Sequence, residues 1–174
     1  MTALRVSLPR TGASDPIGAS PLAHQPESLR AFLKLYGTLW SHGELDQATK
    51  EVARIRNARV VGCPICKAIR FAGARREGLL EEDVAQIRDG YEASDLSPAH
   101  KAVLRYTDVF LGDPHALGAE LRGELLRHLS PAQVVELSAG LALFLGFSKI
   151  AVALGGLPPE IPVHEQPTPD WPVG

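Results

Sequence analysis

Apolar residues recur at steps of three and four positions through the middle of the chain, which is the spacing of one face of a helix. In the stretch PESLRAFLKLYGTLWSHG they include Leu29, Phe32, Leu33, Tyr36 and Trp40. The same period continues downstream, where Gly, Pro and Ser residues divide it into segments. Helices are predicted within residues 26–43, 46–61, 64–76, 80–90, 97–113, 119–129 and 130–156. No strand-like alternation competes with this period, so the sequence predicts an all-α fold.

Proline marks both ends of the chain as non-helical. The first 26 residues hold four prolines and two glycines, which predicts an extended N-terminal arm over residues 1–27. The end of the chain, LPPEIPVHEQPTPDWPVG, predicts a proline-rich tail over residues 157–174. This tail is either loose or lies across a neighbouring subunit with Trp171 as an anchor. The helical domain between the two arms spans residues 28–156, and its length suits one domain.

The last predicted helix is apolar on nearly all sides from Val134 to Leu154. A helix of this kind is buried on all sides, and in so small a domain that favours a core completed by a second copy of the chain. We therefore expect a homo-oligomer. The most apolar stretch, LSAGLALFLGF, is followed by Ser148 and Lys149, so we expect it to be too short to span a bilayer.

Composition and charge narrow the class of protein. Hydrophobic residues make up 45% of the chain and charged residues 22%, which is typical of a soluble globular protein. The net charge of -2 predicts that neither nucleic acid nor an anionic membrane is a main partner. The N-terminus lacks the apolar core of a signal peptide, so we expect a cytoplasmic protein, and structural disulfides are rare in that compartment.

The two cysteines of the chain, Cys63 and Cys66, lie in the stretch CPICKAIR. If a helix begins at Pro64, Cys63 is its N-cap and Cys66 lies in its first turn, where free N–H groups and the helix dipole stabilise a thiolate. Residues 50–76 hold eight basic residues and one acidic residue, a local net charge of +7 (8 − 1). Part of this run is a solvated face, but the remaining charge favours thiolate formation.

Two further residues are candidates for this site. On one continuous helix, positions 63, 66 and 70 share a face, which predicts that Arg70 approaches the Cys66 sulfur as a fixed cation. Arg70 cannot act as a base, because a guanidinium stays protonated in proteins. A helical hairpin around Gly62 would bring Glu51 near Arg70, where it either relays protons to the cysteines or neutralises Arg70; an ordinary salt bridge is the third reading.

Two other interpretations of the cysteine pair stay open. A structural zinc ion needs four ligands, and the six histidines show no pairing at ligand spacing. The other interpretation is that both cysteines are inert, buried small residues.

The stretch EVARIRNARVVGCPICKAIRFAGARREGL resembles the core of the carboxymuconolactone decarboxylase and alkylhydroperoxidase D-like superfamily. That pattern is a glutamate, a CxxC pair twelve residues later, a histidine four residues after the second cysteine, and a closing glycine. Glu51, Cys63, Cys66 and Gly78 match it, and the resemblance covers roughly residues 28–156. It implies an AhpD-like helical bundle with an oligomeric core, assembled as a dimer, trimer or hexamer.

The resemblance also implies a thiol-dependent reduction of hydroperoxides without metal or haem. Cys66 would be the peroxidatic residue, Cys63 the resolving residue and Glu51 part of a proton relay. A dithiol, either a lipoyl group or a thioredoxin-like protein, would reduce the resulting disulfide. The chain departs from the pattern at Arg70, where relatives have histidine, and Ile65 also differs. The alternatives are a carboxymuconolactone decarboxylase-type lactone enzyme and a non-catalytic helical oligomer.

Overall fold

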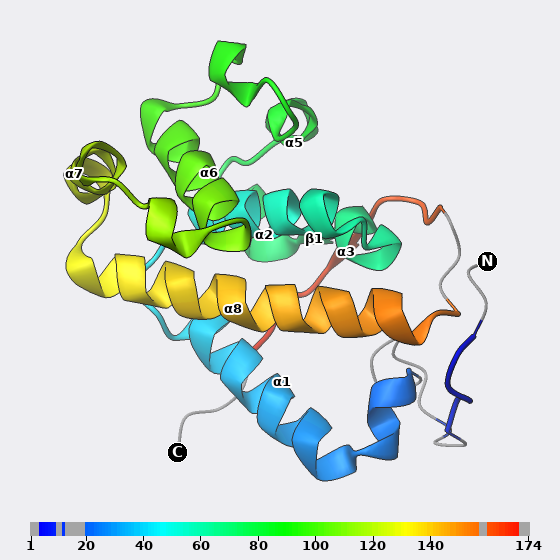
Figure 1. Cartoon of the computed structure of the whole chain (residues 1–174). Coiled ribbons are helices and arrows are strands. Elements are labelled where there is room, and N and C mark those ends of the chain that lie inside the picture. Colours follow the sequence, from blue (N-terminus) through cyan, green and yellow to red (C-terminus); the bar gives the residue numbers. More distant parts are fainter. Residues whose placement is uncertain (1–3, 10–11, 13–19, 157–159, 171–174) are drawn as a thin grey trace.

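The computed structural model of the chain describes residues 4–9, 12, 20–156 and 160–170. Helices dominate this part, which confirms the predicted all-α class (Figure 1). The α-helices are α1 (Pro26–Ser41), α2 (Gln47–Val61), α3 (Pro64–Ala68), α4 (Ala72–Arg76), α5 (Glu81–Gln86), α6 (Pro98–Leu111), α7 (Ala119–His128) and α8 (Pro131–Leu154). The remaining elements are the 3₁₀ turns η1 (Pro21–His24), η2 (Tyr91–Ala93) and η3 (Pro114–Ala116) and the strands β1 (Ile69–Phe71) and β2 (His164–Gln166).

Local capping explains several of the helix boundaries. The Asp46 side chain accepts a hydrogen bond from the Thr49 amide at the start of α2, and Gly62 ends that helix in the left-handed region at φ 74°. Ser130 and Gln133 form a capping box at the start of α8. These ends depend on residues within one turn, which is why the sequence predicts them.

Helix α2 lies at the centre of the domain, with α8 on one side and α6 on another (Figure 1). Its Val52 and Ile55 side chains are fully buried in the main apolar core. A second cluster is aromatic and joins α1, β1 and α8: Tyr36, Trp40, Phe71 and Phe144 pack with ring centroids 4.6 to 6.3 Å apart. Helix α3, which carries Cys66, contacts α2, and Ala151 and Val152 of α8 pack against the two cysteines.

The predicted continuous helix over residues 64–76 is wrong, because the chain is extended at Ile69–Phe71. Arg54 donates hydrogen bonds to the carbonyl oxygens of Cys66 and Ile69, which a longer helix would have used internally. The Gly73 amide donates to the Thr168 hydroxyl. Both groups that interrupt the helix therefore come from elsewhere in the chain.

The C-terminal tail folds back on its own chain. Strand β2 pairs with β1 in parallel, with Arg70 opposite Glu165 in the register. His42 pairs with Asp170 at 2.8 Å, and Ser41 donates to the Pro169 carbonyl. The described part of the tail therefore packs on its own chain, while Trp171, the predicted anchor, lies outside the described residues.

Part of the predicted N-terminal arm also has structure. The turn η1 covers Pro21–His24, and α1 already begins at Pro26. Nearer the start of the chain, the Arg5 amide donates to the Leu154 carbonyl at 2.9 Å. This contact brings the described part of the arm to the end of α8.

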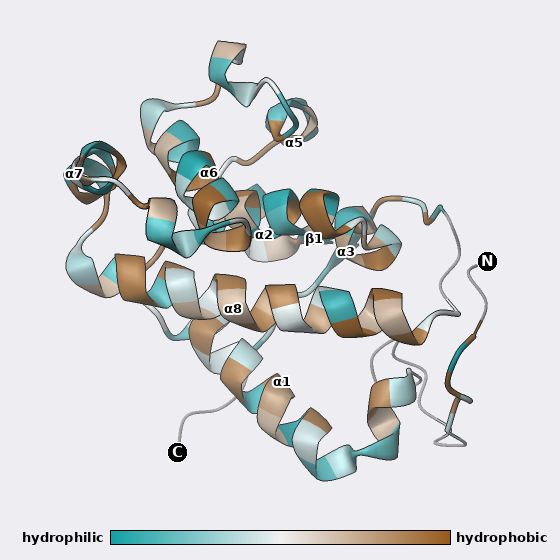
Figure 2. Cartoon of the chain, viewed as in Figure 1, coloured by the Kyte–Doolittle hydropathy of each residue, from teal (hydrophilic) through white to brown (hydrophobic). Residues whose placement is uncertain are grey.

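Within one chain, helix α8 is not buried on all sides. Leu137, Leu141 and Phe144 face the core, but Val135 is 69% exposed and Ile150 is 42% exposed. Figure 2 shows apolar residues along the outward side of this helix.

Helix α8 has 24 residues, so the expectation that its apolar stretch is too short to span a bilayer is wrong. Among the described residues it is the one helix whose length and composition would suit a membrane span, which is weak evidence because core helices of globular proteins pass the same test.

Candidate redox site

Cys63 and Cys66 form a disulfide at the start of α3. Cys63 is the N-cap of this helix, and its sulfur accepts a hydrogen bond from the Cys66 amide at 3.3 Å. Pro64 occupies the first turn, where its missing N–H costs nothing. Both cysteines are buried. The structure thus brings the two predicted residues together as a pair that can store two electrons.

Helix α3 has only five residues, where the sequence predicted thirteen. Its aligned peptide dipoles are correspondingly few, so the macrodipole contributes less to the cysteine pair than a long helix would. Groups from α2 and α8 also contact Cys66: Arg54 at its carbonyl oxygen and Ser148 at its sulfur.

From α2, Glu51 and Arg54 form a buried, two-pronged ion pair with N···O distances of 2.6 and 2.7 Å. The Arg54 guanidinium also donates to the Cys66 carbonyl at 2.6 Å and to the Ile69 carbonyl at 2.7 Å. Burial by itself lowers the pKa of Arg54, but the charge and hydrogen bonds of Glu51 outweigh it and leave that pKa raised. Arg54 therefore links the buried carboxylate to the backbone of the cysteine helix.

The predicted meeting of Glu51 with Arg70 does not occur. The Glu51 carboxylate accepts hydrogen bonds from Arg54 and, at 3.3 Å, from the Phe71 amide. Glu51 thus neutralises Arg54 and supports the start of α4. Its role as a proton relay stays a prediction.

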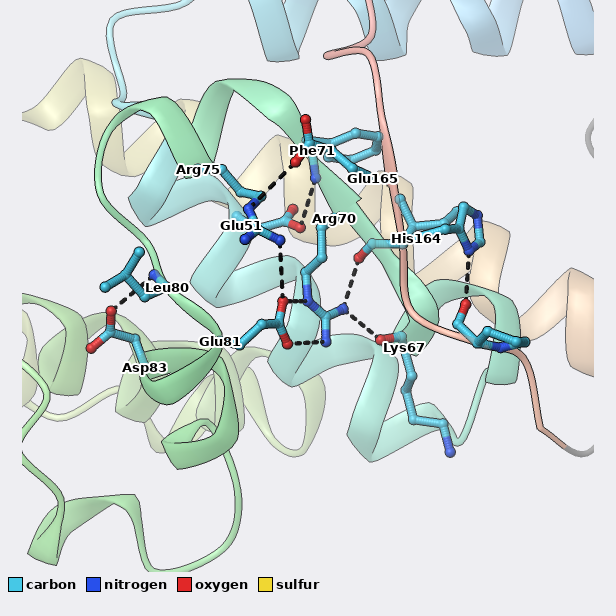
Figure 3. A network of polar contacts seen from close by, with 12 residues as sticks. Glu51, Lys67, Arg70, Phe71, Arg75, Leu80, Glu81, Asp83, His164 and Glu165 are labelled. Carbon is cyan, nitrogen blue, oxygen red and sulfur yellow. Dashed lines mark hydrogen bonds and ion pairs between the residues drawn. The ribbon is translucent and has the colours of Figure 1, made fainter.

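Arg70 lies on β1 and turns to Glu81, as Figure 3 shows. Its guanidinium donates to the two Glu81 oxygens at 2.8 and 3.2 Å. It also donates to the carbonyl oxygens of Lys67 and Ile69 at 2.7 and 2.9 Å. Because residues 66 and 70 are not on one helix, the argument that placed Arg70 on the face of Cys66 fails. The structure places Arg70 in an ion pair that fixes the end of α3.

The strong positive field expected from residues 50–76 is largely neutralised by acids from distant parts of the chain. Lys50 pairs with Glu136 at 2.7 Å, and Arg56 pairs with Asp108 at 2.6 Å. The remaining pairs with acids outside this segment are Arg56 with Asp89, Arg70 with Glu81, and Arg75 with Glu81 and Glu165. The local net charge of the sequence therefore overestimates the field at the sulfurs.

Sequence reasoning missed Ser148, which contacts Cys66, and Asn57, which contacts Ser148. The Ser148 hydroxyl donates to the Cys66 sulfur at 3.4 Å, and the Asn57 amide nitrogen donates to the Ser148 hydroxyl at 3.2 Å. Both side chains are fully buried. Ser148 is 82 positions from Cys66 in sequence, so the only available signal was a polar residue inside an apolar helix. Ala58, Ile65, Ala151 and Val152 complete the surroundings of the disulfide.

Metal ligands do not gather at this site or elsewhere in the part of the chain that the structure describes. There, no three His, Cys, Asp or Glu residues are grouped in a way that could hold a metal ion.

The site thus combines a CxxC disulfide in a helical domain with a buried glutamate that is linked to the Cys66 backbone through Arg54. The family model described as the carboxymuconolactone decarboxylase family matches residues 26–109. This match confirms the resemblance to the carboxymuconolactone decarboxylase family that the sequence indicated.

Two curated relatives are similar in sequence. An uncharacterized protein of Mycobacterium tuberculosis is 30% identical over 117 residues, which cover 67% of this chain and 41% of the relative. Uncharacterized protein 4 in the cox locus of Paracoccus denitrificans is 38% identical over 56 residues, covering 32% of this chain and 50% of that protein. The chain therefore spans half or less of the length of these relatives.

Solved structures share the fold. An uncharacterized peroxidase-related protein from Ralstonia eutropha, described as an alkylhydroperoxidase AhpD core, aligns over 76% of this chain and 70% of its own, with TM-score 0.60 and 19% identity. A variant of the debrominase Bmp8, in complex with 2,3,4-tribromopyrrole, aligns over 88% of this chain and 90% of its own, with TM-score 0.68 and 20% identity. At these identities the likeness establishes the AhpD-like helical fold.

Proposed function

We propose that the protein is a thiol oxidoreductase that reduces hydroperoxides, or exchanges disulfides with a small dithiol, through Cys66 and Cys63. The observation that supports this proposal most directly is the Cys63–Cys66 disulfide at the start of α3. The family match and the peroxidase-related structural neighbours agree with a role of this kind.

The proposed cycle balances with the two cysteines and an external dithiol. The Cys66 thiolate attacks one oxygen of the hydroperoxide, the O–O bond breaks, and the alkoxide leaves as an alcohol after taking a proton. Cys66 is then a sulfenic acid. The Cys63 thiolate attacks its sulfur, which forms the disulfide and releases the hydroxyl as water. The external dithiol reduces the disulfide by exchange and is itself oxidised, so two electrons pass from dithiol to peroxide.

The cycle needs no metal or haem, and its partners are a hydroperoxide and a dithiol of the lipoyl or thioredoxin-like type. Relatives carry a histidine at the position of Arg70, and Arg70 cannot take the thiol proton. The proton must therefore leave by another route, for which Glu51 is the candidate named from the sequence. A low rate of turnover at neutral pH, rising as the thiol ionises, is the expected consequence.

The test is consumption of cumene hydroperoxide with dihydrolipoamide as reductant. We expect turnover by the unaltered protein and none by Cys66→Ser. Cys63→Ser keeps the attacking thiol but not the resolving one, so it should react once and leave a sulfenic acid that dimedone traps. Equal steady-state rates for the unaltered protein and Cys66→Ser would overturn the proposal.

The same proteins distinguish the alternatives. A lactone decarboxylase that does not use the thiols would keep its activity after both cysteines are alkylated. A non-catalytic helical oligomer would show thiols with no reactivity toward peroxide in any variant.

A further inference from the structure

We propose that Ser148 is a catalytic hydrogen-bond donor to the Cys66 thiolate and that Asn57 is the positioning residue that aims its hydroxyl. This inference rests on the proposed function, because it assigns a role within the same thiol site. Neither residue belongs to the sequence pattern that identified the site.

The geometry forms a chain of three side chains from two helices and the cysteine turn. Asn57 on α2 donates through Nδ2 to the Ser148 hydroxyl at 3.2 Å, and Ser148 on α8 donates to the Cys66 sulfur at 3.4 Å. Asn57 and Ser148 are both fully buried, and Cys66 is 5% exposed. Water therefore does not compete strongly for these groups.

The chain of donors has a fixed direction. An amide nitrogen can only donate, so the Ser148 oxygen accepts the hydrogen bond from Asn57. The single hydroxyl proton of Ser148 is then free to point at the sulfur. The Asn57 Oδ1 atom is buried without a hydrogen-bond partner among the described residues, so only the donor end of the amide is engaged. A hydroxyl held in this direction interacts more strongly with a thiolate than with a neutral thiol or a disulfide sulfur.

The charged groups near Cys66 form their hydrogen bonds with other atoms and not with its sulfur. From α2, Arg54 reaches the Cys66 carbonyl and is neutralised by Glu51. From β1, Arg70 is paired with Glu81. Lys67 on α3 and Lys149 on α8 are exposed. Within the described part of the chain, Ser148 is thus the side chain that hydrogen-bonds the sulfur, and α8 otherwise presents Ala151 and Val152 to it.

The hydrogen bond serves two steps of the cycle without a proton leaving Ser148. It stabilises the Cys66 thiolate before attack on the peroxide. It also stabilises the same thiolate as a leaving group when the reductant attacks Cys63. In a site without the histidine of its relatives, this bond lowers the pKa of the thiol and increases the thiolate fraction at neutral pH.

The test measures the Cys66 thiol pKa directly, in a Cys63→Ser background that leaves one thiol, from the rate of iodoacetamide alkylation against pH. Ser148→Ala should raise this pKa by about one to two units, since a hydrogen bond to a charged group is lost. Ser148→Thr, which keeps the hydroxyl, should restore the lower value. Ser138→Ala is the matched control, because Ser138 lies on the same helix and bonds Tyr106 instead.

Ser148→Val serves as a second hydroxyl deletion if the alanine variant does not fold, because it fills the site and differs from Ser148→Thr only in lacking the hydroxyl. A thiol pKa unchanged in a folded Ser148→Ala or Ser148→Val variant would overturn the inference. Asn57→Leu should raise the pKa by a smaller amount, because the hydroxyl remains but loses its fixed direction. An Asn57→Leu pKa equal to that of the parent would contradict the positioning role.

This readout uses no peroxide, so the two proposals fail separately. A raised pKa in a protein that never consumes peroxide would leave the Ser148 inference standing and overturn the proposed function. Peroxide turnover by the unaltered protein, with a thiol pKa that Ser148→Ala leaves unchanged, would support the proposed function and overturn the Ser148 inference.

Discussion

Arg54 donates a hydrogen bond to the main-chain oxygen of Cys66 at 2.6 Å while its guanidinium is paired with the Glu51 carboxylate. The buried glutamate therefore acts on the cysteine turn through an arginine, and it supports the backbone rather than the sulfur. The same guanidinium lies 5.0 Å from the centre of the Phe71 ring, so the aromatic cluster covers the pair.

Removing only one member of this pair should strongly destabilise the fold. Glu51→Gln leaves the Arg54 charge buried without its partner, and we expect a loss of about 3–5 kcal/mol in the free energy of unfolding. Urea unfolding followed by circular dichroism measures it. Replacing both residues, as Glu51→Gln with Arg54→Met, should cost clearly less than the sum of the single changes. A Glu51→Gln loss below about 1 kcal/mol, the scale of an exposed pair, would contradict the buried-pair account.

Arg70 should matter for stability more than for thiol ionisation. Arg70→Ala removes the Glu81 pair and the donors to the Lys67 and Ile69 carbonyls, so we expect a loss of about 1–3 kcal/mol. The Cys66 thiol pKa, measured by alkylation against pH, should stay at its original value. Glu81→Gln is the companion variant and should lower the free energy of unfolding by a smaller amount than Arg70→Ala. A rise of the thiol pKa in Arg70→Ala would instead support the cation role predicted from the sequence.

The tail should hold Ile69–Phe71 in its extended form. Truncation after Gly156 removes β2 and the Thr168 hydroxyl that caps Gly73. We expect faster amide hydrogen exchange at residues 69–73, with little change in α6 and α7. Thr168→Val is a finer variant, which keeps the strand and should accelerate exchange at Gly73 alone. Unchanged exchange in the truncated protein would show that β1 does not need the tail.

The outward face of α8 should be covered by a second copy of the chain. It exposes Val135 and Ile150 together with the small residue Ala139, a face on which another helix can pack closely. Light scattering at micromolar concentration should give the mass of a dimer or larger assembly, and Ala139→Arg should lower it. Ala116→Arg, at an exposed position on η3, is the matched control. A monomeric mass for the unaltered protein would refute this prediction.

Local signals predicted much of the fold. The helical period and the glycine that ends α2 act within one or two turns, and so do the caps that the structure shows at Asp46 and Ser130. The CxxC spacing with Pro64 likewise predicted Cys63 as N-cap. These features could be read from the sequence because each depends on neighbouring residues.

Non-local contacts account for what the sequence did not predict. The helix after Cys66 breaks because Arg54 takes two carbonyl oxygens and because β2, almost a hundred residues away, pairs with the break. That break separates Arg70 from the cysteine face. Ser148 reaches the sulfur only through the packing of α8 on α2, which no spacing rule specifies.

The most direct test of the redox assignment is a single-turnover titration. The fully reduced protein is mixed with one equivalent of cumene hydroperoxide in the absence of reductant, and thiols and peptide masses are then measured. We predict that both thiols of each chain disappear, that one alcohol forms per chain, and that the Cys63–Cys66 peptide loses two hydrogens as the disulfide forms. If two titratable thiols per chain remain and the peroxide is not consumed, the redox assignment is contradicted.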